Sequence, residues 1–280
     1  SYNRAILAKR QAGSAIKPFI WAEALETGVL GPNSILPDEP ITLPGANAGE
    51  DWSPGNYDGK YMGPVSLKDA LAHSRNTVSV RIALLLGIDR LKILFSRVGF
   101  NFPSSLNYSV ALGTYEVSPV ELSLAYTVFP TLGNRWSPRY IEAIYDQIYG
   151  GKVIYQTQPE SKPVFSPKTA SIMNEFLQAV VSYGTGRCAS ALGVPVGGKT
   201  GTTQEYKDAW FIGFTADYTC GVWVGYDKGR TLGKGETGGR IACPLWLNLM
   251  RGTTHEAKPL PVYIPPQESS NATSGEESAQ

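Results

Sequence analysis

The spacing of apolar residues changes once along the chain, and this change limits the possible folds more than any other feature. Between residues 66 and 181 the apolar positions recur at helical intervals. From residue 194 onward the pattern becomes that of strands, over 194–202, 209–215 and 219–226. Successive strands with short connections pair antiparallel. We therefore expect an α/β fold of the α+β type, in which an antiparallel sheet is flanked by helices beside a mainly helical subdomain.

Local signals mark the ends of several helices. Ser66, Ser118 and Ser166 each precede an apolar helical stretch and suit the N-cap position. The last two are followed by proline, which is favoured in the first turn of a helix. Pro244 likewise begins a closing helix, and Gly28 ends the first helix of the chain.

The segments between the helices and strands differ in composition. Residues 29–64 are rich in Pro, Gly, Asn and Asp and predict a long irregular segment, a kind of loop that is often functional. Residues 149–152 read Tyr-Gly-Gly-Lys between two apolar stretches, which predicts a hairpin. The last residues are rich in Pro, Ser and Glu. We expect one domain over residues 1–254 and a largely disordered tail over residues 255–280.

Charge and rare residue types exclude several classes of function. With 25 basic and 24 acidic residues the formal net charge is +1, which gives no reason to expect a nucleic acid partner. The three cysteines are widely spaced and contain no Cys-X-X-Cys, which predicts neither a zinc site nor a disulfide framework. We expect no metal and no other cofactor. Apolar runs are too short to cross a bilayer, and no signal peptide is visible. Because a motif follows Ser1 almost at once, we expect a fragment of a longer protein.

A serine and a lysine near the N-terminus have the spacing of a nucleophile and its base. Ser14 and Lys17 are three residues apart, so one helical turn places hydroxyl and amine on the same face. Pro18 favours a helix start with a tight 3₁₀-like first turn. Apolar neighbours such as Phe19 and Ile20 would bury Lys17 and lower its pKa, so that it could act as a neutral base. The alternative is a capping serine beside a solvated lysine.

A glycine-rich strand supplies a second polar group. Two glycines precede Lys199, and Thr200, Gly201 and Thr202 follow it. Glycines let another backbone or a ligand approach closely, while one ammonium group and two hydroxyls suit a carboxylate. We interpret this stretch as an anion clamp on a strand edge. The alternatives are a turn with an exposed lysine and a phosphate-binding loop, whose glycine spacing and following helix are missing.

Ser74 and Asn76 form a third polar pair, in a tight connection between two predicted helices. Ser-X-Asn also occurs at Ser1, Ser105 and Ser269, but only Ser74 lies in a turn with a buried pattern around it. There a hydroxyl could pass a proton to a leaving amine, and an amide could hold a substrate backbone.

In this order, Ser14-X-X-Lys17, Ser74-X-Asn76 and Lys199-Thr200-Gly201 resemble the penicillin-binding protein and serine β-lactamase superfamily. The likeness covers roughly residues 1 to 252 and points to the transpeptidase domain of bifunctional, class A penicillin-binding proteins. Further stretches carry it: Arg10-Gln11-X-Gly13, Ala111-Leu112-Gly113-Thr114, Asp208-Ala209-Trp210-Phe211 and Val222-Trp223-Val224-Gly225-Tyr226-Asp227.

This resemblance implies a D,D-transpeptidase that cross-links peptidoglycan stem peptides and is acylated and inhibited by β-lactams. Ser14 would attack the D-Ala-D-Ala carbonyl, with Lys17 as the base. Ser74 and Asn76 would handle the proton and the substrate amide. The acyl-enzyme would then pass to the amine of a neighbouring stem peptide.

The resemblance also implies how the substrate is held. Lys199 would supply positive charge, Thr200 and Thr202 would hold the terminal carboxylate, and Gly201 completes the motif between them. The backbone N–H groups of Ser14 and Thr202 would form the oxyanion hole.

The chain departs from the family pattern at its start. Two strands of the family's central sheet precede the serine motif, whereas only thirteen residues do so here. The sheet is then incomplete, or these strands belong to another chain or segment. The membrane anchor and the glycosyltransferase domain that normally come first are also missing. The implied location is the outer face of the cytoplasmic membrane in a bacterial envelope, with this fragment itself soluble.

Three other functions fit the same motifs. A serine β-lactamase shares the site, but the common Glu-X-X-X-Asn is missing. A D,D-carboxypeptidase differs only in its acceptor. A β-lactam sensor domain, which is acylated once and signals, is the non-catalytic alternative.

Overall fold

The computed structural model describes residues 2–44, 51–148, 150–253 and 256–266. Its central sheet consists of β11 (Gly197–Thr202), β12 (Asp208–Phe214) and β13 (Thr219–Gly225), in that order and antiparallel throughout. The expected meander is confirmed, although its first strand begins three residues later than residue 194. Within the described ranges β13 pairs with β12 alone.

Both faces of the central strand β12 are buried, and alternate residues serve two cores. Trp210, Ile212 and Phe214 belong to the main hydrophobic core, whereas Phe211 belongs to a smaller core on the other face. Phe211 meets Trp246 edge to face at 5.2 Å. Successive side chains of a strand point to opposite faces of the sheet. When both faces are buried, the sequence of the strand is a nearly continuous apolar run, as it is in β12.

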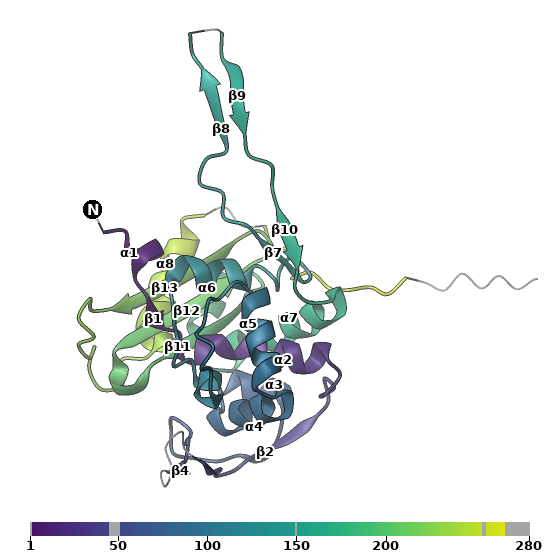
Figure 1. The fold of residues 1–280 in the computed structure, drawn as a ribbon, viewed down its shortest axis with the longest axis vertical. Coiled ribbons are helices and arrows are strands. Elements are labelled where there is room, and N and C mark those ends of the chain that lie inside the picture. Colours follow the sequence, from purple (N-terminus) through teal and green to yellow (C-terminus); the bar gives the residue numbers. More distant parts are fainter. Residues whose placement is uncertain (1, 45–50, 149, 254–255, 267–280) are drawn as a thin grey trace, which may run out of the picture.

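Helix α2 (Lys17–Glu26) lies in the main core, and several other helices pack around it (Figure 1). Phe19 and Trp21 are fully buried, and Trp21 Nε1 donates to the carbonyl of Leu67 at 3.0 Å. Large apolar side chains of this kind contribute about 1.5–3 kcal/mol each when buried. The surrounding helices are α3 (Leu67–Ala72), α4 (Asn76–Leu86), α5 (Ile88–Arg97), α6 (Pro119–Tyr126) and α7 (Pro167–Ser182).

The predicted helix starts are confirmed by their caps. Ser66, Ser118 and Ser166 each accept a hydrogen bond from the backbone N–H three residues on. At Ser118 the side chain of Glu121 also binds back, which completes a capping box. The closing helix α8 (Cys243–Arg251) has its proline in the first turn, as expected. The remaining helical pieces are α1 (Arg4–Leu7), η1 (Gly13–Ile16), η2 (Tyr108–Leu112), η3 (Arg187–Leu192), η4 (Gln204–Tyr206) and the π-helical η5 (Gly238–Ala242).

The segment over residues 29–64 contains more strand than the composition predicts. Strand β2 (Ile35–Asp38) pairs antiparallel with β5 (Gly63–Ser66), and β3 (Leu43–Pro44) pairs with β4 (Asp51–Trp52). Pro37 and Pro64 stand opposite each other in the first ladder. Prolines lack the N–H of a ladder, so the sequence favours a loop there, while an isolated two-stranded ladder tolerates them.

A long hairpin projects away from the rest of the molecule (Figure 1). Strands β8 (Ala143–Asp146) and β9 (Lys152–Gln156) form it, which confirms the hairpin prediction, although Tyr149 lies outside the described residues. At its base β7 (Asn134–Trp136) pairs with β10 (Ser161–Pro163). A further short pair joins β1 (Arg10–Gln11) to β6 (Glu116–Val117).

Part of the segment that follows α8 packs on the domain. Leu260 is buried, and Asn174 Nδ2 donates to the carbonyl of Pro261 at 2.9 Å. The last fourteen residues of the predicted tail, 267–280, lie outside the described residues. Among the residues that are described, no helix is long and apolar enough to span a membrane.

Candidate active site

The serine of the first motif lies in a 3₁₀ turn that packs directly on strand β11. This turn, η1, holds Ser14 and is followed at once by α2, as the proline at position 18 predicts. Gly13 has φ +54°, and a Cβ there would lie 2.7 Å from the carbonyl oxygen of Thr202. On the strand side, a Cβ at Gly201 would lie 2.5 Å from the carbonyl oxygen of Ala12. Two glycines thus bring the Ser14 backbone against the end of β11.

Lys17 is fully buried and points at the second motif. Its Nζ donates to the carbonyl of Ser74 at 2.7 Å and to Asn76 Oδ1 at 2.6 Å, with Ser74 Oγ at 3.3 Å. Burial lowers the pKa of Lys17 well below its usual range, and the positive charges of Lys199 and Arg75 lower it further. Among the described residues, Lys17 donates to Ser74 and Asn76 rather than to the Ser14 hydroxyl.

Lys199 approaches the same serine from the strand. Its Nζ donates to Ser74 Oγ at 2.8 Å and to the carbonyl of Thr200 at 3.1 Å, and the side chain is fully buried. Burial lowers the pKa of Lys199 to about 7. The Ser74 hydroxyl therefore lies between two amines that both have a lower pKa than a solvated lysine.

Ser74 itself has an unusual backbone. It lies in the connection between α3 and α4, with φ +56°. A non-glycine residue in this region costs roughly 1–2 kcal/mol, because its Cβ approaches the following carbonyl. The backbone N–H groups of Ser74 and of the next residue are both hydrogen-bonded. Ser74 N donates to Leu71 O at 3.0 Å, and Arg75 N donates to Ala70 O at 2.8 Å. The predicted tight connection is confirmed, and it aims the hydroxyl at the two lysines.

The threonines of the third motif have partners that the sequence did not reveal. Thr200 Oγ1 shares a hydrogen bond with Thr185 Oγ1 at 2.6 Å, and Thr202 Oγ1 accepts from the backbone N–H of Gly238 at 3.1 Å. Thr185 follows the glycine that ends α7, and Gly238 opens η5. Neither position carries a recognisable pattern, because both reach β11 only through the folding of distant segments.

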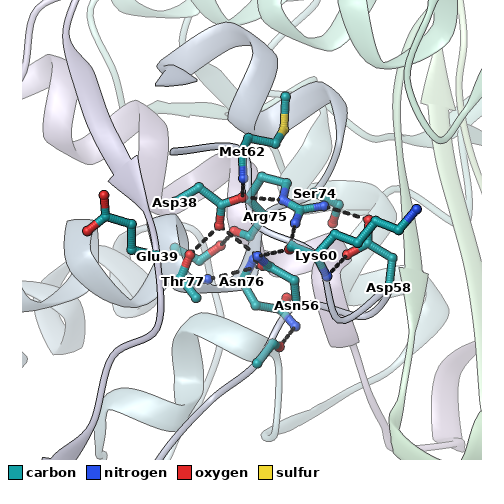
Figure 2. Close-up of polar contacts among 12 residues, drawn as sticks. Asp38, Glu39, Asn56, Asp58, Lys60, Met62, Ser74, Arg75, Asn76 and Thr77 are labelled. Carbon is teal, nitrogen blue, oxygen red and sulfur yellow. Dashed lines mark hydrogen bonds and ion pairs between the residues drawn. The ribbon is translucent and has the colours of Figure 1, made fainter. Parts of the chain in front are cut away.

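Both polar atoms of the Asn76 side-chain amide form hydrogen bonds. Its Oδ1 accepts from Lys17, while its Nδ2 donates to the carbonyl of Gly55 at 2.8 Å. Its backbone N–H donates to Asn56 Oδ1 at 2.7 Å, and Figure 2 shows this contact within a larger polar cluster. Residues 55 and 56 belong to the loop that was expected to be functional from its composition, but no pattern singled them out.

Taken together, the three predicted motifs meet in one place. Ser74 connects them, since its hydroxyl contacts Lys17 of the first motif and Lys199 of the third. A hydroxyl next to two buried amines of lowered pKa can pass protons in either direction, and Ser14 on the adjacent turn supplies a second hydroxyl. Such an arrangement of hydroxyls and amines can support acyl transfer to a serine.

Comparisons with known proteins agree with this geometry. The family model "Penicillin binding protein transpeptidase domain" matches residues 1–250. Penicillin-binding protein 1A of Neisseria gonorrhoeae is 41% identical over 260 residues, which cover 90% of this chain and 32% of that protein. The chain thus spans about a third of the length of this curated relative.

Solved structures share the fold. Penicillin-binding protein 1A from Haemophilus influenzae superposes with a TM-score of 0.87 at 30% identity, over 95% of this chain and 45% of that one. PonA1 from Mycobacterium tuberculosis, solved in complex with penicillin V, superposes with a TM-score of 0.80 over 95% of this chain and 78% of that one. At 24% identity the second likeness shows the fold alone. The chain belongs to the penicillin-binding protein transpeptidase domain family, and its curated relatives are class A penicillin-binding proteins.

Proposed function

We propose that this chain is a D,D-transpeptidase that joins peptidoglycan stem peptides through an acyl-enzyme on Ser14. The observation that carries the proposal is the convergence of Lys17 and Lys199 on the Ser74 hydroxyl, beside the turn that holds Ser14. A serine is a weak nucleophile until a neighbouring base removes its proton, and a buried lysine of lowered pKa is such a base. The family match supports the same reaction type.

Lys17 is the base in this mechanism. A neutral lysine amine has two N–H groups, and Ser74 O and Asn76 Oδ1 accept hydrogen bonds from Nζ at 2.7 and 2.6 Å. The lone pair of the amine is then free to take the proton of Ser14 as its Oγ attacks the D-Ala-D-Ala carbonyl. The backbone N–H groups of Ser14 and Thr202 would stabilise the oxyanion, since η1 packs against the end of β11.

The proton then travels to the leaving group. Ser74 Oγ, next to both amines, passes it to the nitrogen of the departing D-alanine as the peptide C–N bond breaks. Protonated Lys199, with the hydroxyls of Thr200 and Thr202, holds the terminal carboxylate of the donor peptide. An amine of a second stem peptide then attacks the ester and releases Ser14. In a β-lactam the nitrogen of the cleaved amide stays attached to the acyl group, so no fragment departs and the drug remains on the serine.

The chain is proposed to work as one part of a longer envelope protein. The curated relative, penicillin-binding protein 1A of Neisseria gonorrhoeae, is about three times as long as the part that matches here. We place the site on the outer face of the cytoplasmic membrane, where stem peptides are found. A glycosyltransferase domain and a membrane anchor on the same protein belong to this proposal.

The test is the intact mass of the protein after incubation with benzylpenicillin. We expect one covalent adduct in the wild type, none in Ser14→Ala, and one in Ser190→Ala, whose serine is exposed on η3 and serves as the matched control. A Ser14→Ala protein that is still acylated would refute the nucleophile. Rapid loss of free drug without an adduct would indicate a β-lactamase, and released D-alanine without cross-linked product would indicate a carboxypeptidase. A stable adduct with no turnover of stem peptide would indicate a sensor.

A further inference from the structure

A cluster of charged and polar side chains, buried except for Asp58 at its edge, lies directly behind the second motif (Figure 2). We call it the Asp38 cluster, and its members are Asp38, Asn56, Asp58, Arg75 and Thr77. Asp38 is fully buried at the end of β2, and Arg75 is 5% exposed between Ser74 and Asn76. Buried charges of this kind are costly, so their contacts need an explanation.

Asp38 uses both of its carboxylate oxygens. Its Oδ2 accepts from Arg75 Nε at 2.7 Å and from the backbone N–H of Met62 at 2.9 Å. Its Oδ1 accepts from Asn56 Nδ2 at 2.7 Å and from the hydroxyl of Thr77. Burial acts to raise the pKa of Asp38, but these hydrogen bonds outweigh it and hold the carboxyl ionised.

Arg75 spreads its guanidinium over three groups. Besides Asp38, its Nη1 donates to Asp58 Oδ2 at 3.0 Å and its Nη2 donates to the carbonyl of Lys60. These partners lie on β2 and on the loop before β5, far from Arg75 in sequence. The fork of a guanidinium fixes both the position and the orientation of the residue that carries it. Arg75 therefore ties the connection between α3 and α4 to that loop.

Asn56 links Asp38 to Asn76, the residue that follows Arg75. It donates to Asp38 Oδ1 and accepts from the backbone N–H of Asn76. Asn76 in turn accepts from Lys17 Nζ at 2.6 Å. A continuous path of hydrogen bonds thus runs from Asp38 through Asn56 and Asn76 to the amine of Lys17.

We propose that Asp38 and Arg75 are positioning residues for acyl transfer, which hold Ser74 and Asn76 in place against Lys17 and Lys199. The proposal rests on the proposed function. Ser74 keeps an unfavourable φ of +56°, and the two residues that follow it, Arg75 and Asn76, are anchored by this cluster. Loss of the anchor would let the backbone relax and turn the Ser74 hydroxyl away from the two amines.

A purely structural role is the alternative, and the chain contains a matched control for it. Glu23 is also a fully buried carboxylate, and it binds Arg90 and Arg97. It lies on α2, the helix of Lys17, but its partners come from α5 and not from the site. Glu23→Gln therefore removes a buried ion pair from the same core without touching Ser74 or Asn76.

The experiment compares acylation kinetics with thermal stability in the wild type, Asp38→Asn and Glu23→Gln. Stopped-flow measurements with a fluorescent penicillin separate the acylation rate constant from the dissociation constant of the first complex. We expect Asp38→Asn to lower the acylation rate constant by roughly tenfold or more, with a smaller change in the dissociation constant. Glu23→Gln should lose a similar amount of melting temperature and keep its acylation rate constant within about twofold.

Two further variants keep the test decisive. Arg75→Lys retains the charge but loses the fork, so it carries the same expectation if Asp38→Asn does not fold. In the double variant Asp38→Asn/Arg75→Gln, two amides replace the ion pair and no unpaired buried charge remains. Its loss of acylation should be smaller than the product of the losses measured in Asp38→Asn and in Arg75→Gln alone, because the residues act as a pair.

The outcomes separate the two proposals. Asp38→Asn and Arg75→Lys proteins acylated as fast as the wild type would overturn the positioning role and leave the proposed function intact. Equal losses of acylation in Asp38→Asn and Glu23→Gln would likewise overturn it, since stability alone would explain both. A folded wild type that neither forms an adduct nor consumes the penicillin would overturn both proposals.

Discussion

Two lysines show how strongly burial decides the behaviour of individual residues in this protein. Lys17 and Lys199 are both fully buried, with 0% of their surface accessible to solvent. Desolvation is the first cause of the lowered pKa in each case. Both amines nevertheless keep hydrogen-bond partners at Ser74. These bonds offset part of the cost of burying the amines, and they fix where the two amines lie relative to Ser74.

The lowered pKa of Lys199 predicts a pH dependence of ligand binding. With a pKa of about 7, Lys199 is charged below that pH and becomes neutral above it. The affinity of the first complex with a carboxylate-bearing β-lactam should therefore weaken as pH rises through about 7. The measurement is the dissociation constant of that complex from acylation kinetics between roughly pH 5.5 and 8.5, a range that lies on both sides of this lowered pKa.

A variant provides the control for this pH dependence. Lys199→Met has no titrating charge at the position, so its affinity should be lower at acid pH and should not change through neutrality. A Lys199→Met protein with the same pH dependence as the wild type would assign the titration to another group.

Among the structural elements, the contact between η1 and β11 determines where the nucleophile lies. Trp210 Nε1 donates to the carbonyl of Gln11 at 2.9 Å, which holds the chain before η1 against the sheet. Tyr126 donates from α6 to the carbonyl of Ala15. The turn is thus held from the strand side and from the helix side, and the Ser14 backbone stays beside Thr202.

Gly201→Ala is expected to disturb this contact. Its new Cβ would lie 2.5 Å from Ala12 O and 3.1 Å from the Cβ of Ala15, so η1 must move away from β11. Overpacking of this kind costs roughly 1–3 kcal/mol, and the acylation rate should fall by more than tenfold because Ser14 moves with the turn. Urea unfolding and penicillin acylation measure the two effects.

Gly31→Ala is the matched control for this substitution. A Cβ there would meet its nearest neighbour, Ser34 Oγ, at 3.9 Å, which is ordinary contact. Stability and acylation should both stay near wild type. Normal acylation in Gly201→Ala would show that the close approach of η1 and β11 is not needed.

In the whole molecule, the site and the projecting hairpin are separate parts. The three motifs lie in the body of the domain, whereas β8 and β9 extend away from it (Figure 1). Ile144, Tyr145 and Ile154 are all exposed on the hairpin, and Ile148 is 87% exposed. Exposed apolar strands with open edges favour association.

Removal of the hairpin should therefore improve solubility without loss of activity. Replacement of residues 143–156 by a short glycine-serine linker is expected to keep the melting temperature and the acylation rate close to wild type, because neither core includes a described residue of this range. Light scattering should show less association at high concentration. A large loss of acylation in the shortened protein would show that the hairpin supports the site.

Much of the secondary structure and the motif residues follow from local patterns. Caps at Ser66, Ser118 and Ser166, the 3₁₀ turn before Pro18 and the three strands depend on neighbours within a few positions, so a single sequence is sufficient to predict them. The same reasoning failed for β2 and β5, because their prolines hide a ladder formed by segments far apart in the chain.

The contacts that assemble the site depend on the folded chain. Lys17 meets Ser74 across 57 positions, and Lys199 meets it across 125. Asp38 meets Arg75 across 37 positions in the sequence, and nothing in the residues around either one indicates the pair. Side-chain chemistry is encoded locally and can be recognised in a sequence, whereas partners at long range are chosen by packing, in which many weak contacts act at once.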